Sequence, residues 1–151
     1  MRLTNRTDYA LRTLMVLGAS GRRHTVPALA EALGISAHHL TKIVQVLQSE
    51  GWVSTTPGRG GGVELAGAPA EITVGEVVRA MEPDLHLVEC LREEGACPLE
   101  RPCRLAGALR TARDAFLGTL DAVTLSDLID GHETSLLRLV PATLNVNGSP
   151  G

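Results

Sequence analysis

Aromatic side chains are almost absent from this sequence: its 151 residues include one Trp, one Tyr and one Phe. The core must therefore be built from Leu, Val, Ile and Ala. We do not expect base stacking on aromatic rings, a common way of binding single-stranded nucleic acid. Hydrophobic residues make up 44% and charged residues 21% of the chain, a balance typical of a folded domain. The length suits one compact domain, or one small domain with an attached helix.

Long apolar runs are also missing. No segment approaches the ~20 apolar residues that a membrane span needs. The apolar stretch at residues 14–19 follows three arginines, but it is too short for a signal peptide, and Asp8 interrupts the basic segment before it. We therefore expect an amphipathic helix of a cytoplasmic protein with no membrane partner. Three cysteines are an odd number, so a disulfide framework is not expected.

Patterns of a catalytic site are lacking as well. The five histidines show no zincin spacing, and no serine-nucleophile motif occurs. The glycine-rich residues 57–62 fit a dinucleotide-binding loop poorly, because Val63 stands where the third glycine is needed and no helix follows. We do not expect an enzyme.

The charge is uneven along the chain. The first 66 residues contain seven Lys/Arg and four Asp/Glu, whereas the remainder contains seven and thirteen. A mildly basic front is consistent with binding to a polyanion, although chance variation can produce the same split.

Two short helices with a tight turn between them are predicted in the basic front. A first helix begins after Thr4. The second opens around Pro27 and stops at Gly34, and Ser36 caps the third. Because the turn between the second and third helices is so short, the pattern predicts a helix-turn-helix.

A β-hairpin is predicted directly after these helices. Two extended runs, at residues 52–56 and 63–65, flank the glycine-rich residues 57–62. A helix-turn-helix followed by a hairpin is a winged helix, so the expected fold is mainly α with a small β-hairpin wing.

The acidic back of the chain predicts further helices. Thr73 caps a helix at residues 74–81, and Glu76 completes its capping box. After an irregular segment, a long helix runs from 103 to about 120, and its alanines would let a second helix approach closely. A short helix follows at 125–129.

The polar face of the third helix is the first candidate functional site. His38, Thr41, Lys42 and Gln45 lie at i, i+3, i+4 and i+7, so they share one face. Gln can bond adenine, Lys can reach guanine or phosphate, and Thr can contact a thymine methyl. This face enters the major groove in helix-turn-helix proteins. A merely solvated helix face is the alternative.

Arg59, at the glycine-rich hairpin tip, is the second candidate, because an Arg on a slim tip suits a narrow minor groove. The complete set of expected DNA-binding residues comprises Arg2, Ser36, His38, Thr41, Lys42, Gln45, Arg59 and Gly60.

The cysteines form the third candidate. Cys90, Cys97 and Cys103 are separated by six and five residues and precede the long helix. Three thiolates can close around one metal centre, and both zinc and iron–sulfur clusters accept them. The spacing matches neither the zinc-finger nor the ferredoxin pattern, so buried core thiols and a thiol–disulfide sensor stay open.

Taken together, these motifs resemble the NsrR/IscR family of winged-helix iron–sulfur transcription repressors, and within it the NsrR-like members. The resemblance covers roughly residues 1–130. It rests on the opening MRLT and TDYALR, on LTKI in the third helix, on GRGGG in the hairpin, on ITVGEVV and on the three cysteines.

The resemblance implies a homodimer that binds a palindromic double-stranded DNA operator, with one iron–sulfur cluster per subunit held by Cys90, Cys97 and Cys103. We favour a 4Fe–4S over a 2Fe–2S cluster, and nitric oxide as the signal. The alternatives are a sensor of redox or iron status and a cluster-free thiol redox sensor. Asp8 occupies the position of the fourth ligand, donated by the other subunit, although an i,i+4 pair with Arg12 is the alternative.

The same resemblance divides the chain into functional parts. Residues 1–81 form the winged helix-turn-helix DNA-binding domain, and 82–102 form the cluster-binding loop. Residues 103–130 form the dimerisation helix region, and residues 141–151 are expected to be a disordered tail.

Overall fold

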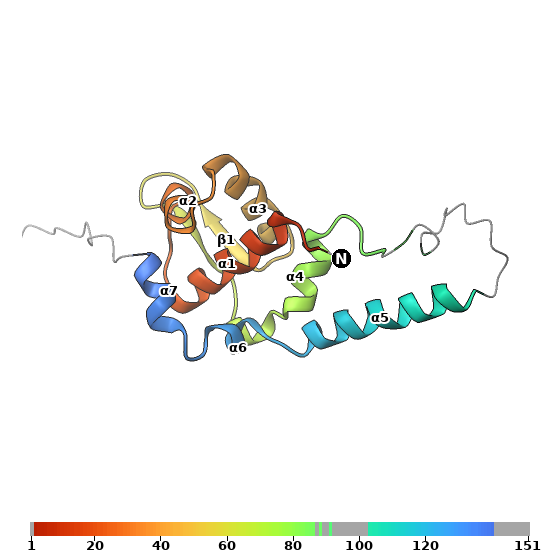
Figure 1. Ribbon diagram of the computed structural model, residues 1–151. Helices are drawn as coiled ribbons and strands as arrows, with labels where there is room; N and C mark the ends of the chain where they lie inside the picture. Colours follow the sequence, from red (N-terminus) through yellow and green to blue (C-terminus); the bar gives the residue numbers. More distant parts are fainter. Residues whose placement is uncertain (1, 87, 89–90, 92–102, 141–151) are drawn as a thin grey trace, which may run out of the picture.

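The computed structural model describes residues 2–86, 88, 91 and 103–140. The expected tail at 141–151 and most of the expected loop at 82–102 lie outside this part. The elements, in chain order, are α1 (Asn5–Ser20), α2 (Val26–Leu33), α3 (Ala37–Ser49), β1 (Val53–Thr56), β2 (Gly62–Leu65), the 3-10 turn η1 (Pro69–Glu71), α4 (Val74–Met81), α5 (Arg104–Asp121), α6 (Leu125–Ile129) and α7 (Glu133–Leu139) (Figure 1). The predicted fold class is confirmed, and η1 and α7 are additions to it.

The helix-turn-helix is built by local capping, as predicted. The Thr25 hydroxyl accepts a hydrogen bond from the Ala28 N–H (3.3 Å), and the Ser36 hydroxyl accepts one from the His39 N–H (3.2 Å). Gly34 ends α2 in the left-handed region at φ 64°, where a side chain would be strained. These caps fix the short turn that sets α3 against α2.

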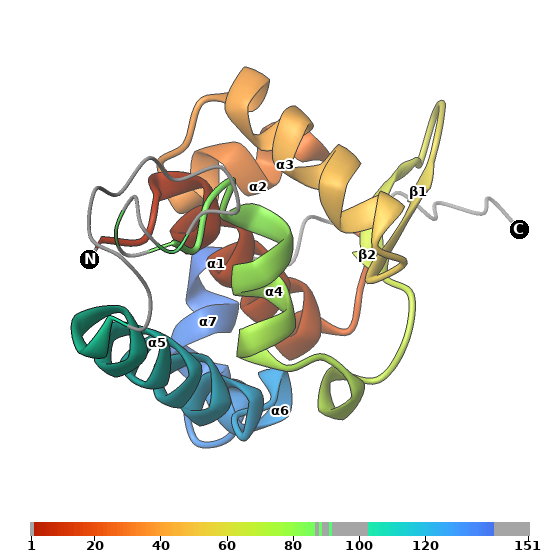
Figure 2. The same cartoon turned by 90° about the vertical axis from the view of Figure 1, so that its right-hand side faces the viewer.

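The wing is the antiparallel pair β1–β2, in which Val53 lies opposite Leu65 and Thr56 opposite Gly62. Two backbone hydrogen bonds also join β2 to the segment that connects α1 and α2. The His24 N–H donates to the Val63 carbonyl (2.9 Å), and the Val63 N–H donates to the His24 carbonyl (2.7 Å). Figure 2 shows the hairpin on one side of the helical body and α5 on the other.

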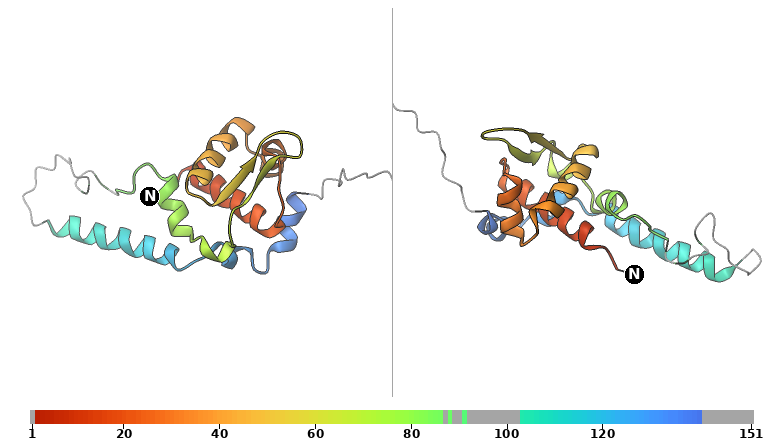
Figure 3. Two further views of the ribbon diagram at one scale, coloured as in Figure 1. Left: turned by 180° about the vertical axis from the view of Figure 1, so that it is seen from behind. Right: turned by 90° about the horizontal axis from the view of Figure 1, so that it is seen from above.

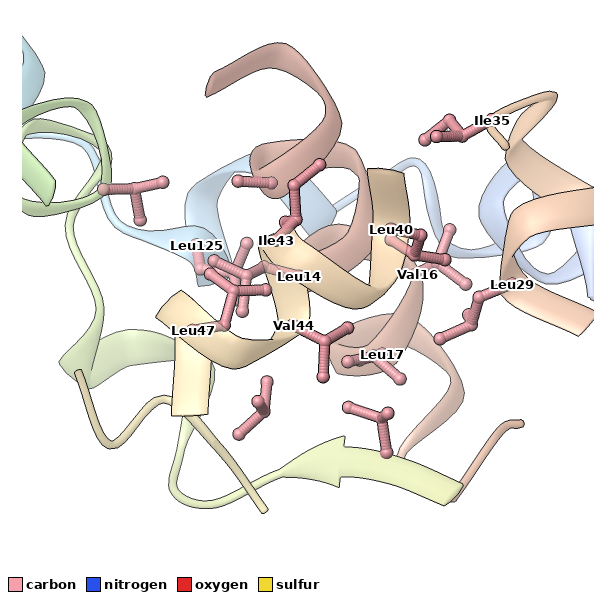
Figure 4. Packing of buried hydrophobic residues seen from close by; sticks show 14 of the residues in the cluster. Leu14, Val16, Leu17, Leu29, Ile35, Leu40, Ile43, Val44, Leu47 and Leu125 are labelled. Atoms are coloured by element: carbon pink, nitrogen blue, oxygen red, sulfur yellow. The ribbon is translucent and has the colours of Figure 1, made fainter. Parts of the chain in front are cut away.

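The core is aliphatic, as the lack of aromatic residues requires. Leu14 and Leu17 of α1, Leu29 of α2 and Leu40 and Leu47 of α3 are fully buried and pack together (Figure 4). Each fully buried leucine stabilises the fold by roughly 1.5–3 kcal/mol relative to an exposed one. The core therefore holds α3 to α1 through the face opposite to its polar face.

The base of α5 is anchored to α4. Arg79 donates two hydrogen bonds to the Asp121 carboxylate, at 2.5 and 2.7 Å. A Cβ at Gly75 would lie 1.9 Å from the Asp121 Oδ1, so glycine permits this close crossing. The remainder of α5 projects from the body (Figures 1 and 3). Leu117 is the buried residue of α5, whereas Leu105 near its start is 61% exposed.

No helix in the described part of the chain is long and apolar enough to span a lipid bilayer.

Candidate nucleic-acid interface and cysteine segment

The polar face of α3 is open to solvent. His38, Thr41, Lys42 and Gln45 are all exposed there. The Thr41 hydroxyl donates to the Ala37 carbonyl (2.8 Å), which occupies its polar hydrogen and leaves its methyl group for apolar contact, such as with a thymine methyl. The α3 face thus offers an amide, an ammonium group, an imidazole and a methyl group side by side.

Ser36 lies at the N-terminal end of this face. Its hydroxyl oxygen caps α3 by accepting from the His39 N–H, and its hydroxyl hydrogen is still able to donate to a phosphate. Its structural role is therefore observed, while the expected DNA contact stays a prediction.

The wing presents Arg59 between Gly58 and Gly60, which have φ of 85° and 70°. Arg59 is exposed. A Cβ at Gly61 would lie 2.2 Å from the Thr56 carbonyl oxygen, so the tip must be glycine at this position to stay narrow. This slim shape is the geometry that we expect of a minor-groove contact.

Sequence reasoning missed how the wing is joined to α3. The Thr55 hydroxyl of β1 donates to the Gln48 Oε1 of α3 at 3.0 Å. With the His24–Val63 bridge, this bond sets the direction of the wing relative to α3. No local pattern signals the bond, because each residue is also ordinary on a solvated surface.

Sequence reasoning also missed the cap of α1. The Glu82 Oε1, just after α4, accepts hydrogen bonds from the Thr4 N–H (2.8 Å), the Thr4 hydroxyl (3.1 Å) and the buried Thr7 hydroxyl. Thr4 itself makes no side-chain cap. A carboxylate from 78 residues away therefore holds the first turn of α1, just after Arg2, which is exposed.

Asp8 forms the i,i+4 pair that is the alternative to a ligand role. The Arg12 Nε and Nη2 lie 3.0 and 2.9 Å from the two Asp8 carboxylate oxygens. Both side chains are about half exposed, so the pair adds little stability. Donation of Asp8 to a cluster of the other subunit stays a prediction.

The cysteine site is described only in part. Cys90 and Cys97 lie outside the described residues, and the residues that are described contain no group of three or more His, Cys, Asp and Glu placed to hold a metal. Cys103 is a free, half-buried thiol at the N-cap of α5, and its side chain makes no capping hydrogen bond. Cysteine sulfur is a ligand that zinc and iron–sulfur clusters accept, so Cys103 fits the role of a ligand.

His24 is a buried titratable group of the winged helix. It is 7% exposed, and its Nε2 lies 2.9 Å from the Ser20 hydroxyl. Burial, and to a smaller extent the charge of Arg22, lower the pKa of His24 from its usual 6.5.

The helix-turn-helix, the wing and the polar face of α3 define the class of protein: a winged-helix DNA-binding protein. A family model described as "Rrf2: Iron-dependent Transcriptional regulator" matches residues 3–131. The chain therefore belongs to the Rrf2 family.

Relatives point to one part of this family. The chain is 49% identical over 143 residues to the HTH-type transcriptional regulator NsrR of Geobacillus kaustophilus, covering 91% of this chain and 97% of the relative. It is 41% identical over 136 residues to NsrR of Bacillus subtilis, covering 88% and 93%. It is thus NsrR-like, and these relatives are regulators, not enzymes.

A solved structure supports the fold. The structure of CymR, the global cysteine regulator of B. subtilis, matches with a TM-score of 0.70 and 27% identity, over 85% of this chain and 96% of that chain.

Proposed function

We propose that the protein is a homodimeric transcriptional repressor whose binding to a palindromic DNA operator is switched by an iron–sulfur cluster that senses nitric oxide. The observation that supports it most is the exposed polar face of α3, held at a fixed angle to the Arg59 wing. An α-helix of this kind fits the major groove, and a slim cationic tip fits the adjoining minor groove.

The dimer would form through α5. This helix projects from the body, and Leu105 is 61% exposed in the single chain. Its small residues Ala108, Ala112 and Ala115 are exposed too, so a second helix could pack against it closely. Two recognition helices about one turn of DNA apart, ~34–36 Å, then meet the two half-sites of a palindrome.

Cys90, Cys97 and Cys103 would hold the cluster, with Asp8 of the partner subunit as the fourth ligand; when bound, its iron supplies the reaction with nitric oxide. Arg12 pairs with both carboxylate oxygens of Asp8 in the single chain. Ligation would require Arg12 to give up at least one of them. The states with and without the cluster would therefore differ in the Asp8–Arg12 pair on α1. Because α1 packs directly against α3, this difference lies next to the proposed recognition helix.

The size of the switch is limited by what differs between the two states. A single coordinated contact, present in one state and absent in the other, shifts operator affinity by ~1–3 kcal/mol, which corresponds to a factor of 5 to 150. A larger effect would need further contacts that differ between the states.

The proposal is tested by gel shift on protein purified without oxygen, using a duplex enriched from a randomised pool. Cluster-loaded wild type should bind more tightly than both nitrosylated wild type and the Cys103→Ser variant. Equal affinity of all three for the duplex would contradict the switch, and failure to enrich any duplex would contradict DNA binding itself.

Iron status is the second candidate signal, because the matching family model is described as iron-dependent. The two signals separate in the same assay. With free iron kept in excess, nitric oxide should still release the operator if our first proposal is right, whereas the operator should stay bound if iron status is the signal.

A further inference from the structure

An open recess of about 400 Å³ lies between the first turns of α1 and the flank of α3. Residues of both helices line it: Asn5, Arg6, Tyr9, His39, Lys42 and Ile43. None of these residues is acidic. The recess adjoins the polar face of α3, since Lys42 belongs to both.

The lining divides into a cationic rim and an apolar floor. Arg6 and Lys42 are exposed, and neither forms an ion pair with a described acidic residue. Ile43 is 3% exposed and belongs to the core, and the half-buried Tyr9 packs against the same core. Such a lining matches a deoxyribose–phosphate unit, which is apolar on the sugar and anionic on the phosphate.

The position of the recess agrees with this chemistry. His39 follows His38 by one position, so it lies about 100° further around α3, between the polar face and the buried Ile43. If the polar face enters the major groove, the flank bearing His39 turns toward the strand that borders the groove. The groove edge presents phosphates.

The recess is also preorganised. Glu82 fixes the first turn of α1 through Thr4 and Thr7, and the shared core fixes α1 against α3. The backbone of the recess is therefore in place before a ligand arrives, and only its exposed side chains need to be ordered, which limits the entropic cost of binding.

We propose that this recess binds one backbone phosphodiester of the operator strand bordering the major groove. Arg6 and Lys42 donate to the phosphate oxygens, and Tyr9 and Ile43 contact the sugar. The inference rests on the proposed DNA binding. It adds Arg6, Tyr9 and Ile43 to the expected DNA-binding residues and assigns Lys42 to a phosphate.

The first test compares Arg6→Gln with wild type and with Arg138→Gln. Arg138 is an exposed arginine of α7 outside the recess, so its variant makes the same change in net charge. The affinity of the dimer for the enriched duplex is measured by fluorescence anisotropy over a series of salt concentrations. The plot of log K against log salt has a negative slope. Each lost phosphate contact should make this slope shallower by ~0.9, which is about 2 for a dimer with one recess in each subunit.

Wild type and Arg138→Gln should have the same salt dependence. Arg6→Lys should have nearly the same salt dependence as wild type, because lysine restores the positive charge. The order of preference among duplexes with single base changes should stay the same in Arg6→Gln, because a phosphate contact carries no base information. Equal slopes for Arg6→Gln and Arg138→Gln would overturn the proposal.

The second test locates the phosphate. Uncharged methylphosphonates replace the backbone phosphates of the duplex one at a time. Substitution at one position in each half-site should weaken binding by wild type more than binding by Arg6→Gln, which retains only Lys42 at that phosphate. If every position weakens both proteins equally, the recess binds no phosphate. If Arg6→Gln instead raises the dimer dissociation constant, the recess receives the second subunit, and the proposal is wrong while DNA binding stands.

Discussion

At the residue scale, Glu82 supplies the helix cap that the adjacent sequence does not. We expect Glu82→Ala to lower the free energy of unfolding by about 1–2 kcal/mol, because the first turn of α1 and the buried Thr7 hydroxyl lose their acceptor. Urea unfolding at one fixed protomer concentration measures the change. Glu31→Ala, at an exposed helical position, should stay within ~0.5 kcal/mol of wild type. Equal losses in both variants would refute the cap.

His24 gives a pH dependence whose sign follows from its burial. Because the pKa of His24 is lowered in the fold, the unfolded chain binds its proton more readily. The stabilising contribution of the neutral imidazole is therefore complete above pH 6.5. It is lost as pH falls from 6.5 toward the folded pKa, by at most about 1.4 kcal/mol per pH unit.

The variant His24→Gln should flatten this part of the curve of unfolding free energy against pH. The comparison uses slopes and not absolute stabilities, because glutamine also changes the packing around residue 24. Parallel curves for variant and wild type between pH 5 and 7 would count against a buried neutral His24.

At the scale of the element, α3 and the wing should read DNA differently. Gln45→Ala should relax preference at one base position by ~1–3 kcal/mol, because an amide contact to a base edge is lost. Arg59→Ala should weaken binding to all duplexes by a similar factor. Anisotropy against a set of duplexes with single base changes measures both profiles, and indistinguishable profiles would mean that the two elements are assigned wrongly.

Local elements could be predicted from the sequence, whereas contacts between them could not. The Ser36 and Thr73 caps and the glycine-rich hairpin depend on neighbouring residues, and all three were predicted and are present. The Glu82 cap and the Thr55–Gln48 bond depend on tertiary packing and leave no local pattern. The short helix α7 was missed for the same reason: its N-cap makes no side-chain bond, and it packs against α1.

The candidate site also contains some features that the local sequence predicts and others that depend on tertiary packing. The exposure of Lys42 and Gln45 and the placement of Arg59 at the wing tip agree with the sequence pattern. The recess lined by Arg6 and Lys42 forms where α1 packs beside α3, so the residue spacing within either helix does not predict it. The ligand roles of Asp8 and of the three cysteines stay predictions.

At the scale of the whole molecule, the proposed dimer is joined through α5. We expect Leu105→Glu to shift the protein from dimer toward monomer with its helical content retained, since Leu105 is 61% exposed and contributes little to the protomer core. Sedimentation velocity measures the shift. Leu139→Glu, at a 43% exposed leucine of α7, is the matched control and should stay dimeric. Monomerisation by both variants or by neither would contradict this interface.

The central claim is that an iron–sulfur cluster between two subunits controls operator binding. Its most direct test is one anaerobic titration of the full chain with nitric oxide, in which cluster absorbance and the anisotropy of a bound duplex are recorded together. We predict that the duplex dissociates in proportion to the cluster lost, with total protein still dimeric. Cluster loss with the duplex still bound, or a fresh preparation that binds the duplex without iron, would contradict it.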